Sequence, residues 1–519
     1  MPLNELLPKA VKLFPEREAI VCNNIRMNYE EFAERVWQLS NGLIRTGIQR
    51  NDRVAILHEN CHVFLETYFA AAHLGVILVP LNFRLSTKEL ATILNDSRPR
   101  ILISQNAFRD KAAGIRDKVP HIEKIVWTQR SPEIELEPTD LDYEPFLKEQ
   151  PKTPPPELNI KDEDVAHLYY TSGTTGRPKG VMLTHKNVKT HALGTIAEFH
   201  LTDRDRWFHV APLFHLADAW ATFAITWVGG KHVLIPSFDP GEVLHMIEQE
   251  KITLSNLIPT MLNMMVNHPD VDKFDYSSLR VILSGGASIA PETVRKIVEA
   301  FKCDYIQTYG MTETSPYLTL SILKKHLRDL PWEGQLRYKA RTGREFINVS
   351  LKVVDDQGNE VAQDDKQVGE IIVKGDIVTS GYWNLPEETE KAIKDGWLFT
   401  GDMAVVDSEG YVNIVDRKKD MIITGGENVY STEVENILYT HPDILEAAVV
   451  GVPDEHWGES VKACVVLKDG CSTNEKEIIA FCKDNLAHYK APKSVDFLSE
   501  LPRTGSGKIY KKALRAPYL

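Results

Sequence analysis

The chain has 519 residues, with 60 Lys and Arg against 73 Asp and Glu and a formal net charge of −13. This balance argues against a general nucleic-acid binder, because such proteins need a basic surface to displace counterions from phosphates. The length suits about two to four structural units, each large enough to bury a core. Any anion that the protein handles must therefore bind at a local basic site.

The N-terminal segment, residues 1–5, lacks the basic and long apolar regions of a signal peptide. No window approaches the roughly 18 uninterrupted apolar residues of a membrane span. The six cysteines form no C-x-x-C pair, which suits reduced thiols better than disulfides or a zinc ribbon. These features predict a cytoplasmic protein without an integral membrane segment.

Residues 50–310 alternate short β-rich runs with stretches whose apolar residues have helical spacing. Residues 54–57 and 101–104 are typical β-runs, and residues 63–74 are a typical helical stretch. Repeated βα units of this kind predict mostly parallel sheets covered by helices. The proline-rich segment 151–157 is either a domain boundary or a surface crossing inside one large domain.

The character of the sequence changes after about residue 343. Short alternating runs with Gly- and Asp-rich turns predict a small antiparallel or barrel-like unit to about residue 415. A helical stretch at 431–439 and β-runs at 447–452 and 461–467 predict a further small unit. The expected fold class is α/β: a large N-terminal domain of βα subdomains with mixed sheets plus a small β-barrel-like unit, joined by a hinge to a small C-terminal α+β domain.

The most informative stretch is YYTSGTTGRPKGV, which begins at Tyr169 and ends at Val181. A β-run enters a loop with three Gly, four hydroxyls and two cations. Such a loop can wrap phosphate oxygens with backbone N–H groups, hydroxyls and a Lys, because Gly permits close approach of the backbone. No G-x-x-x-x-G-K-[ST] occurs in the chain, so an ordinary P-loop NTPase is disfavoured.

This loop resembles the phosphate-binding signature of the adenylate-forming acyl-CoA synthetases, the superfamily that includes luciferases and non-ribosomal peptide adenylation domains. Further signatures follow in the expected order, so the resemblance covers nearly the whole chain. It implies an adenylation domain over residues 1–417, with the β-rich subdomain at about 343–415, and a mobile C-terminal domain over residues 418–519. The hinge would lie at Lys419, two residues after Arg417.

The resemblance also implies an ATP site. In the segment YGMTET, Tyr309 would stack near adenine, Thr312 would contact the α-phosphate and Glu313 would help to hold Mg²⁺. A hard cation prefers carboxylate and phosphoryl oxygens, which fits a Glu at this position. Asp402 and Arg417 would bind the ribose hydroxyls. The predicted ATP-binding residues are Thr171, Ser172, Gly173, Thr174, Thr175, Gly176, Lys179, Gly285, Gly286, Ala287, Tyr309, Asp402 and Arg417.

Lys508, in the segment PRTGSGKI, resembles the adenylation lysine of the family. A Lys on a Gly/Ser loop can bridge a substrate carboxylate and the α-phosphate, and losing such a preorganised cation typically costs about 3–4 kcal/mol. Gly425 and Gly426 would let the backbone approach a narrow ligand, which in the family is the pantetheine arm of CoA. We therefore predict Lys508, Glu313 and Thr312 as catalytic residues, with Glu313 as a Mg²⁺ ligand, and Gly425 and Gly426 as the CoA site.

His215 and Trp220 are the predicted acyl-pocket residues. The segment PLFH, which ends at His215, resembles the family segment that borders the carboxylate entrance. His215 could instead be a core histidine with satisfied hydrogen bonds, although the pocket is favoured, and aromatic residues such as Trp220 more often belong to the core. Asp218, three residues after His215, is unusual for a wholly apolar tunnel and could equally face solvent.

Two other enzyme classes find little support. His58 and His62 belong to an H-E-x-x-H sequence, but residues 54–57 read as a strand that runs straight into it, whereas zinc binding needs both His on one helix face. No G-x-S-x-G is present, so a nucleophile-elbow serine hydrolase is not indicated.

These residues predict a two-step ligase that uses ATP, Mg²⁺ and CoA. A carboxylate attacks the α-phosphorus of MgATP to give acyl-AMP and pyrophosphate, and after the small domain turns, CoA takes the acyl group as a thioester. A medium- or long-chain fatty acid is the first expectation, with an aryl acid as the alternative. A carrier protein as acceptor, a luciferase-like oxidoreductase and a non-catalytic carboxylate-binding module stay open as other functions. The expected partners are small molecules and no nucleic acid, and a homodimer stays open.

Overall fold

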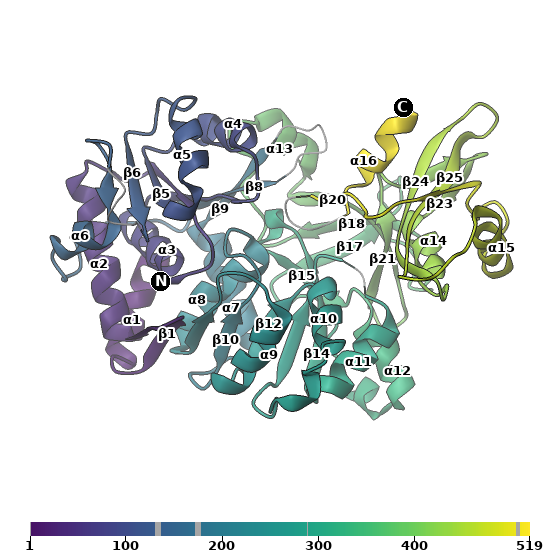
Figure 1. Cartoon of the computed structure of the whole chain (residues 1–519), viewed down its shortest axis with the longest axis horizontal. Helices are drawn as coiled ribbons and strands as arrows, with labels where there is room; N and C mark the ends of the chain where they lie inside the picture. The colour runs from purple at the N-terminus through teal and green to yellow at the C-terminus, as the bar shows by residue number, and fades with distance from the viewer. Residues whose placement is uncertain (1, 130–135, 172–177, 288, 505–508) are drawn as a thin grey trace. The chain divides into compact units, whose positions relative to one another are not determined.

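The structure is a computed structural model that describes residues 2–129, 136–171, 178–287, 289–504 and 509–519 (Figure 1). The chain forms two compact units: the first unit holds residues 1–350 and 374–398, and the second unit holds residues 351–373 and 399–519. The proline-rich segment 151–157 lies within the first unit, so it is a crossing inside that unit. No helix of the described part is long and apolar enough to cross a membrane.

A seven-stranded sheet is the first layer of the first unit. Its order is β7-β6-β5-β3-β4-β8-β9, with all neighbours parallel except the antiparallel pair β8 and β9. Residues of α4 and α5 join the strands in one buried apolar cluster, which explains why the strands read as continuous apolar runs. The elements are β3 (Arg53–Leu57), α3 (His62–Leu74), β4 (Ile77–Pro80), α4 (Thr87–Ser97), β5 (Ile101–Gln105), α5 (Arg109–Arg116), β6 (Lys124–Thr128), β7 (Leu141–Asp142), α6 (Tyr143–Lys148), β8 (Val165–Thr171) and β9 (Lys179–Thr184).

A nine-stranded sheet forms the second layer, in the order β16-β15-β14-β13-β12-β10-β11-β1-β2. The run from β14 to β1 is parallel, and β2, β15 and β16 pair antiparallel at its two edges. Helices α9, α10 and α11 bury their apolar faces against this sheet.

The elements of this layer are α1 (Leu6–Leu13), β1 (Glu18–Cys22), β2 (Ile25–Asn28), α2 (Tyr29–Arg45), α7 (His185–Phe199), β10 (Arg206–His209), α8 (Leu216–Val228), β11 (Lys231–Leu234), α9 (Pro240–Gln249), β12 (Leu254–Leu257), α10 (Pro259–Val266), β13 (Val281–Ser284), α11 (Pro291–Phe301), β14 (Asp304–Gly310), the 3₁₀ turn η4 (Thr312–Thr314), β15 (Tyr317–Leu320), α12 (Trp332–Lys339) and β16 (Arg344–Glu345). In both layers the connections after parallel strands leave from the carboxyl edge of the sheet. In open α/β sheets this edge is where ligands bind.

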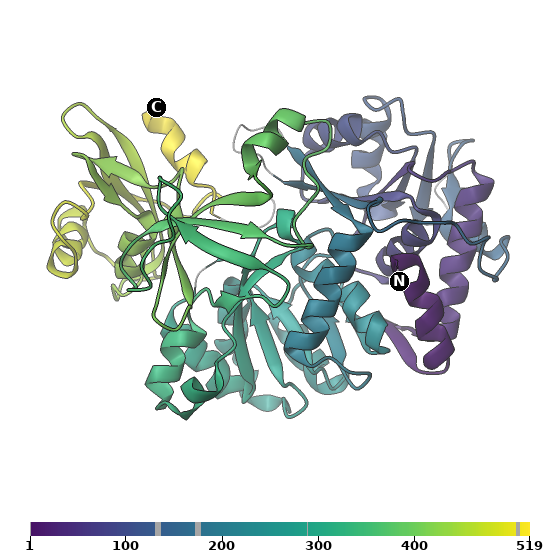
Figure 2. The same ribbon diagram turned by 180° about the vertical axis from the view of Figure 1, so that it is seen from behind.

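The β-rich region after residue 343 is a five-stranded sheet, seen in green in Figure 2. Strand β20 pairs antiparallel with β19 and with β21, and in the second pair Asp402 lies opposite Arg417. The elements are β17 (Ser350–Val354), β18 (Gly369–Lys374), α13 (Pro386–Ala392), β19 (Ile393–Lys394), β20 (Trp397–Val406) and β21 (Val412–Arg417).

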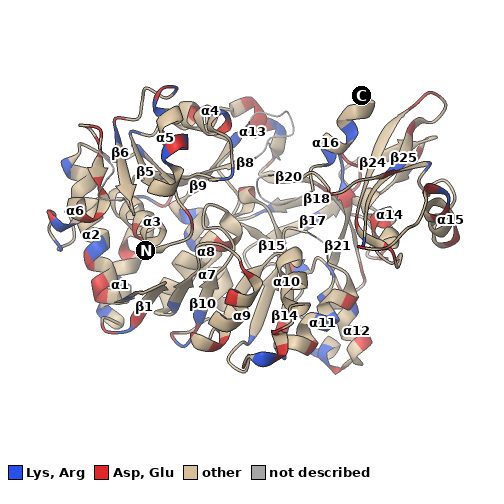
Figure 3. Ribbon diagram, viewed as in Figure 1, with Lys and Arg blue, Asp and Glu red and all other residues tan. Residues whose placement is uncertain are grey.

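The last hundred residues form a small α+β sheet of five strands with its own apolar core. The path runs β23-β22-β25-β24, and β26 pairs parallel with β25. Lys and Arg, drawn blue, mark α16 at the end of the chain (Figure 3). The elements are β22 (Ile422–Thr424), β23 (Glu427–Val429), α14 (Ser431–Leu438), β24 (Ile444–Asp454), β25 (Gly458–Leu467), α15 (Glu475–Asn485), β26 (Ser494–Phe497) and α16 (Lys511–Arg515).

The structure confirms the α/β fold class and the elements expected from the sequence. The β-runs at 54–57 and 101–104 are β3 and β5, and the helical stretch at 63–74 is α3. The domain boundary expected between residues 417 and 418 stays a prediction, since the contacts of residues 399–417 group this hairpin with the rest of the second unit.

Candidate active site

The described ends of the predicted phosphate loop lie on adjacent strands. Thr171 ends β8 and lies opposite Lys179, the first residue of β9. The ammonium of Lys179 lies 2.6 Å from Oε2 of Glu388 and 4.9 Å from the ring centroid of Tyr382. The predicted loop therefore joins two adjacent antiparallel strands, and a cation begins the second of them. The predicted ligands between these strands lie outside the described residues: Ser172, Gly173, Thr174, Thr175 and Gly176.

A short segment after β18 joins this hairpin to Glu313. The backbone N–H of Met182, in β9, donates to the carbonyl of Gly381 at 3.0 Å. The backbone N–H of Thr379 donates to the carbonyl of Glu313 at 2.7 Å, and the Tyr382 hydroxyl donates to Glu313 Oε1 at 3.0 Å. Two predicted motifs that are far apart in the sequence thus share one bridging segment, residues 379–382.

Sequence reasoning missed Tyr382 and Glu388. Burial, together with the charge of Glu313, raises the pKa of the Tyr382 hydroxyl well above its ordinary value, so this hydroxyl stays a donor to the carboxylate. Lys179 and Lys391 lower the pKa of Glu388 to about 2. The only signal in the sequence is the aromatic pair Tyr382-Trp383 after a Gly, which does not reveal a partner 69 residues upstream.

Glu313 and Thr312 lie in η4, directly after the carboxyl end of β14. Glu313 is 7% exposed and its carboxylate is oriented by Tyr382, whereas Thr312 and Tyr309 are half-buried. Within the described residues, no group of three or more His, Cys, Asp or Glu side chains could hold a metal ion. One oriented carboxylate nonetheless fits Mg²⁺, which is commonly held by one or two carboxylates together with substrate phosphates and water.

The turn after β13 is held against β14. A Cβ on Gly285 would lie 2.4 Å from Oγ1 and 2.9 Å from the carbonyl O of Thr308, so only glycine fits there. The Thr308 hydroxyl donates to the carbonyl of Ser284 at 3.1 Å, and the Gln307 amide donates to the carbonyl of Ala287 at 2.8 Å. Gly286 is exposed with a φ of +84°. The structure thus brings Gly285, Gly286 and Ala287 beside the strand that carries Tyr309.

Asn60 fixes the connection between β10 and α8, which carries His215. Its side-chain amide donates to the carbonyls of His209 at 3.2 Å and Ala211 at 2.9 Å, and its Oδ1 accepts from the N–H of Leu213 at 2.7 Å. Asn60 is buried in the connection after β3. His215 is half-buried and is the residue before the first turn of α8.

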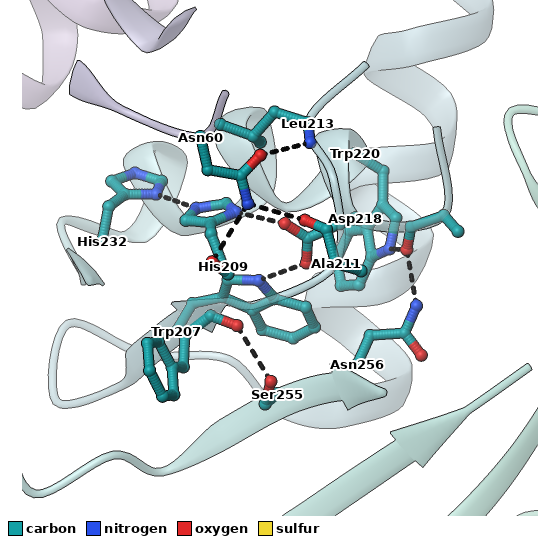
Figure 4. A network of polar contacts seen from close by, with 12 residues as sticks. Asn60, Trp207, His209, Ala211, Leu213, Asp218, Trp220, His232, Ser255 and Asn256 are labelled. Carbon is teal, nitrogen blue, oxygen red and sulfur yellow. Dashed lines mark hydrogen bonds and ion pairs between the residues drawn. The ribbon is translucent and has the colours of Figure 1, made fainter. Parts of the chain in front are cut away.

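Asp218 does not face solvent, contrary to one of the two expectations for it. It is fully buried, and its two oxygens accept from Trp207 Nε1 at 3.0 Å and from His209 Nδ1 at 2.6 Å (Figure 4). His209 Nε2 lies 2.9 Å from Nδ1 of His232, whose Nε2 lies 2.9 Å from the Thr226 hydroxyl. Both carboxylate oxygens are therefore used to fix α8 to β10.

Trp220 is 2% exposed and belongs to an aromatic cluster of α7, α8, β10 and β15. Its ring centroid lies 4.8 Å from that of Trp207 and 5.4 Å from that of Tyr317. Its Nε1 donates to the Tyr317 hydroxyl at 3.0 Å. A role of Trp220 and His215 in the acyl pocket stays a prediction.

The H-E-x-x-H residues do not share a helix. His58 lies in the connection after β3, where its Nε2 is 2.7 Å from the hydroxyl of Thr128, and His62 is the first residue of α3. Burial lowers the pKa of His58 to about 4. This geometry lacks the two ligands on one helix face that the zincin arrangement needs.

In the second unit, Asp402 and Arg417 form an ion pair across β20 and β21. Arg417 Nε lies 2.7 Å from Asp402 Oδ1, with 3% of the Asp402 side chain and 47% of the Arg417 side chain exposed. The Asp402 backbone N–H donates to the Thr400 hydroxyl at 3.1 Å. A buried carboxylate beside a half-exposed guanidinium can present both acceptors and donors to a polyhydroxyl ligand.

The predicted hinge follows this pair. Lys419 is exposed, and the neighbouring Lys418 lies 3.0 Å from Glu370 Oε2. Asp416 precedes the predicted hinge, and its carboxylate accepts from the backbone N–H of Ser431, a residue after the hinge. These contacts lie on the two sides of Lys419 in the chain.

Gly425 and Gly426 form the tight turn between β22 and β23, with φ angles of +59° and +85°. The Gly425 N–H donates to the carbonyl of Trp457 at 2.9 Å, and a Cβ on Gly425 would lie 2.8 Å from the Trp457 ring. The Trp457 side chain, which sequence reasoning did not single out, is half-exposed. The predicted catalytic Lys508 lies outside the described residues.

Comparison with known proteins places this arrangement in a family. Residues 7–383 match the model of the AMP-binding enzyme family, and residues 433–508 match the model of the AMP-binding enzyme C-terminal domain. The chain therefore belongs to the adenylate-forming acyl-CoA synthetase superfamily and is an AMP-forming acid–CoA ligase.

The relatives cover nearly the whole chain. A feruloyl-CoA synthase from an Amycolatopsis species is 38% identical over 508 residues, which are 98% of this chain and 97% of that protein. The 4-hydroxybutyrate–CoA ligase 2 of Metallosphaera sedula is 34% identical over 517 residues, 98% of this chain and 93% of that protein. The crystal structure of ATP-bound MatB from Rhodopseudomonas palustris is 30% identical, with a TM-score of 0.88, and the match covers 100% of this chain and 99% of that one.

Proposed function

We propose that the protein converts a carboxylic acid, ATP and CoA into an acyl-CoA, AMP and pyrophosphate in two half-reactions. The carboxylate oxygen attacks the α-phosphorus of ATP and pyrophosphate leaves; the CoA sulfur then attacks the acyl carbon and AMP leaves. The observation that carries this proposal is the segment 379–382, which joins the phosphate-loop hairpin to Glu313. This segment contacts both β9, which begins with the cation Lys179, and the carboxylate of Glu313.

The first unit supplies the phosphate and adenine contacts in this proposal. Thr171, Lys179 and the hairpin loop between them bind the phosphates, Thr312 contacts the α-phosphate, and Tyr309 packs near adenine beside the glycine turn. Glu313 would hold Mg²⁺, which would neutralise phosphate charge during the displacement. Tyr382 acts on Glu313 by orienting its carboxylate through the 3.0 Å hydrogen bond.

The second unit supplies the ribose and CoA contacts. Asp402 and Arg417 bind the ribose hydroxyls, and Lys508 offsets charge as the pentavalent α-phosphorus forms. After a turn about Lys419, Gly425 and Gly426 admit the pantetheine arm. All six cysteines are free thiols, which supports a reducing compartment such as the cytoplasm.

For the acid, a compact substrate is better supported than the medium- or long-chain fatty acid that the sequence placed first. Trp207, Trp220 and Tyr317 fill the space beside α8 with buried aromatic rings. Two relatives carry the names of ferulate and 4-hydroxybutyrate ligases, both compact hydroxy acids, whereas two others, 33% and 34% identical, are named long-chain-fatty-acid–CoA ligases. The preference for a compact acid thus depends on the aromatic rings beside α8. We therefore place aryl and short hydroxy acids ahead of long-chain acids.

A pyrophosphate-release assay with ATP, Mg²⁺ and a panel of aryl, short-chain and long-chain acids tests this proposal, with free CoA added to detect the thioester. We expect release with compact acids and thioester formation with free CoA. Release without thioester would indicate a carrier protein as acceptor, and no release with any acid would overturn the proposal.

Lys508→Ala separates the half-reactions. We expect it to reduce acyl-AMP formation by about 10²–10³-fold, the usual effect of losing one preorganised electrostatic contact. Thioester formation from supplied acyl-AMP should be largely spared. Equal losses in both half-reactions would contradict the role proposed for Lys508.

A further inference from the structure

Asp96, in the last turn of α4, contacts the hairpin that carries the predicted phosphate loop. The Tyr170 hydroxyl donates to Asp96 Oδ2 at 2.7 Å, across 74 positions of sequence. Tyr170 lies in β8, directly before Thr171, and is opposite Gly180 of β9. All these residues belong to the first unit. A helix that carries none of the predicted site residues thus reaches the base of the loop.

The same residue also holds the segment that follows Tyr382. The backbone carbonyl of Asp96 accepts from Trp383 Nε1 at 3.3 Å. Trp383 comes directly after Tyr382, which orients Glu313. The Trp383 backbone N–H donates to the carbonyl of Gly180 at 2.7 Å. The side chain of Asp96 therefore fixes β8, and its backbone fixes the segment that orients the carboxylate.

Gly180 lies where these two contacts meet. A Cβ there would lie 2.9 Å from Cζ of Tyr170 and 3.2 Å from Cβ of Trp383, so both side chains pack closely on the glycine backbone. Close packing transmits a displacement, since there is no empty space to absorb it. A shift of Tyr170 would therefore move the start of β9, where Lys179 lies next to Gly180.

The helix that carries Asp96 does not explain a carboxylate at this place. The C-terminal end of a helix is the negative end of its dipole, where cations stabilise the helix and anions do not. Asp96 is half-buried in the last turn of α4. A hydrogen bond to a carboxylate is stronger than one between neutral groups, so the contact with Tyr170 can offset this disadvantage.

We propose that Asp96 is a positioning residue for ATP binding. It sets Thr171 and Lys179, at the two ends of the predicted phosphate loop, against the segment that orients Glu313. Asp96 acts through Tyr170 and does not itself touch ATP, because its charge repels phosphates. The proposal rests on the proposed function, since it assumes that the β8–β9 hairpin binds the phosphates. It adds a residue outside the sequence motifs, and it assigns that residue to ATP rather than to the acid.

Asp96→Ala and Tyr170→Phe in the full-length enzyme test the proposal. In titration calorimetry with MgATP and no acid, we expect the Kd to rise about 10-fold in each, because each variant loses one hydrogen bond to a carboxylate. In the pyrophosphate-release assay, the KM for ATP should rise by a similar factor, whereas the KM for the acid at saturating ATP should not change. The double variant should bind ATP as well as Asp96→Ala does, since both changes remove the same contact.

Asn95→Ala is the matched control on the same helix. The Asn95 amide donates to the carbonyls of Ala91 at 2.9 Å and Lys118 at 3.1 Å, neither of which belongs to the β8–β9 hairpin. This variant should leave the Kd for ATP unchanged. Asp96→Asn, whose amide oxygen can still accept from Tyr170, should bind ATP more tightly than Asp96→Ala does. Thermal unfolding shows that each variant is folded.

Two results would overturn the proposal: ATP binding that is unchanged in both Asp96→Ala and Tyr170→Phe, or an equal loss in Asn95→Ala. A rise in the KM for the acid as large as that for ATP would also overturn it, because it would indicate a general disturbance of the first unit. A wild-type enzyme that binds no ATP would instead overturn the proposed function.

Discussion

The two units of the molecule keep buried polar groups in different ways. The first unit buries neutral imidazoles: His167, His191 and His232 are all at most 1% exposed, and burial lowers the pKa of each. The second unit relies on pairs of opposite charge, such as Lys511 with Glu435 at 2.8 Å and Lys462 with Asp496 at 2.7 Å. The first unit also buries ion pairs, such as Arg35 with Glu66 at 2.6 Å. The difference is that the first unit adds buried neutral imidazoles to such pairs, and these side chains must stay neutral in the folded state.

Two buried aspartates show the contrast in detail. Asp218 of the first unit is held by Trp207 and His209, which lie within 11 residues of it in the chain. Asp416 of the second unit is held by Ser431, which lies beyond the proposed hinge. Burial raises the pKa of Asp416, whereas the charge of Lys511 opposes this effect. The first contact fixes α8 to β10, and the second joins residues on the two sides of the proposed hinge, so it would break if the residues after Lys419 turned away from Asp416.

The largest expected effect is that of Asp218→Ala. It leaves Trp207 Nε1 and His209 without their acceptor in a fully buried place, so we expect the free energy of unfolding of the first unit to fall by about 3–5 kcal/mol. Urea unfolding followed by tryptophan fluorescence measures it, because Trp457 is the only tryptophan of the second unit.

Asp218→Asn is the matched control, since an amide oxygen can still accept from Trp207. Its free energy of unfolding should fall clearly less than that of Asp218→Ala. If Asp218→Ala cost no more than an exposed substitution, the network would not be what fixes α8 to β10.

Acid is expected to weaken the first unit before the second. Four buried histidines have pKa values lowered by burial to about 3 or 4: His58, His167, His185 and His191. They are neutral when folded, so their contribution is fully present above the unfolded pKa of about 6.5 and is lost as the pH falls. Between pH 6.5 and 5.5 each histidine should lower the free energy of unfolding by about 1 kcal/mol, because only the unfolded chain takes up the proton.

The contribution of Asp416 to stability depends on pH in the opposite direction. Its folded pKa is raised, so its contribution is present below the ordinary pKa of about 3.8 and is lost as the pH rises through the folded value. Hydrogen exchange at pH 7.5 and 5.5, after correction for intrinsic rates, should therefore show loss of protection mainly in the first unit. His167→Phe should flatten this pH dependence, and His200→Gln at an exposed position should not. Equal acid sensitivity of both units would break the comparison.

Much of the fold could be predicted because its helices and strands follow from short stretches of the sequence. The apolar runs that became β3 and β5 and the helical spacing of α3 each lie within about a dozen residues of sequence. The candidate site could be predicted only where a motif carries its own chemistry, as around Glu313. Tyr382 and Asn60 could not be found, because each acts on backbone or side-chain groups 69 and about 150 residues away.

A smaller effect is expected for Lys511→Met in the second unit. Lys511 lies 2.8 Å from Glu435, and its charge also acts on Asp416. Because a fifth of the Lys511 side chain is exposed, we expect the free energy of unfolding of the second unit to fall by about 1–2 kcal/mol. Because Asp416 precedes the proposed hinge and Lys511 follows it, the variant should also favour the turned state. Thioester formation from supplied acyl-AMP should then rise relative to pyrophosphate release. An unchanged ratio of the two half-reactions would mean that this cluster does not restrain the turn.

The smallest effect should come from Lys418→Met, next to the proposed hinge residue. Lys418 pairs with Glu370 at 3.0 Å, and 49% of the Lys418 side chain is exposed. An exposed pair of this kind is worth at most about 1 kcal/mol and is screened by salt, so urea unfolding at 0.5 M NaCl should show no difference from the wild type. The contrast with Lys511→Met then tests burial, because both variants remove a lysine that pairs with a glutamate in the same unit, and the further partner of Lys418, Asp356 at 3.6 Å, is exposed. A loss in Lys418→Met as large as that in Lys511→Met would mean that net charge, and not the buried cluster, stabilises the second unit.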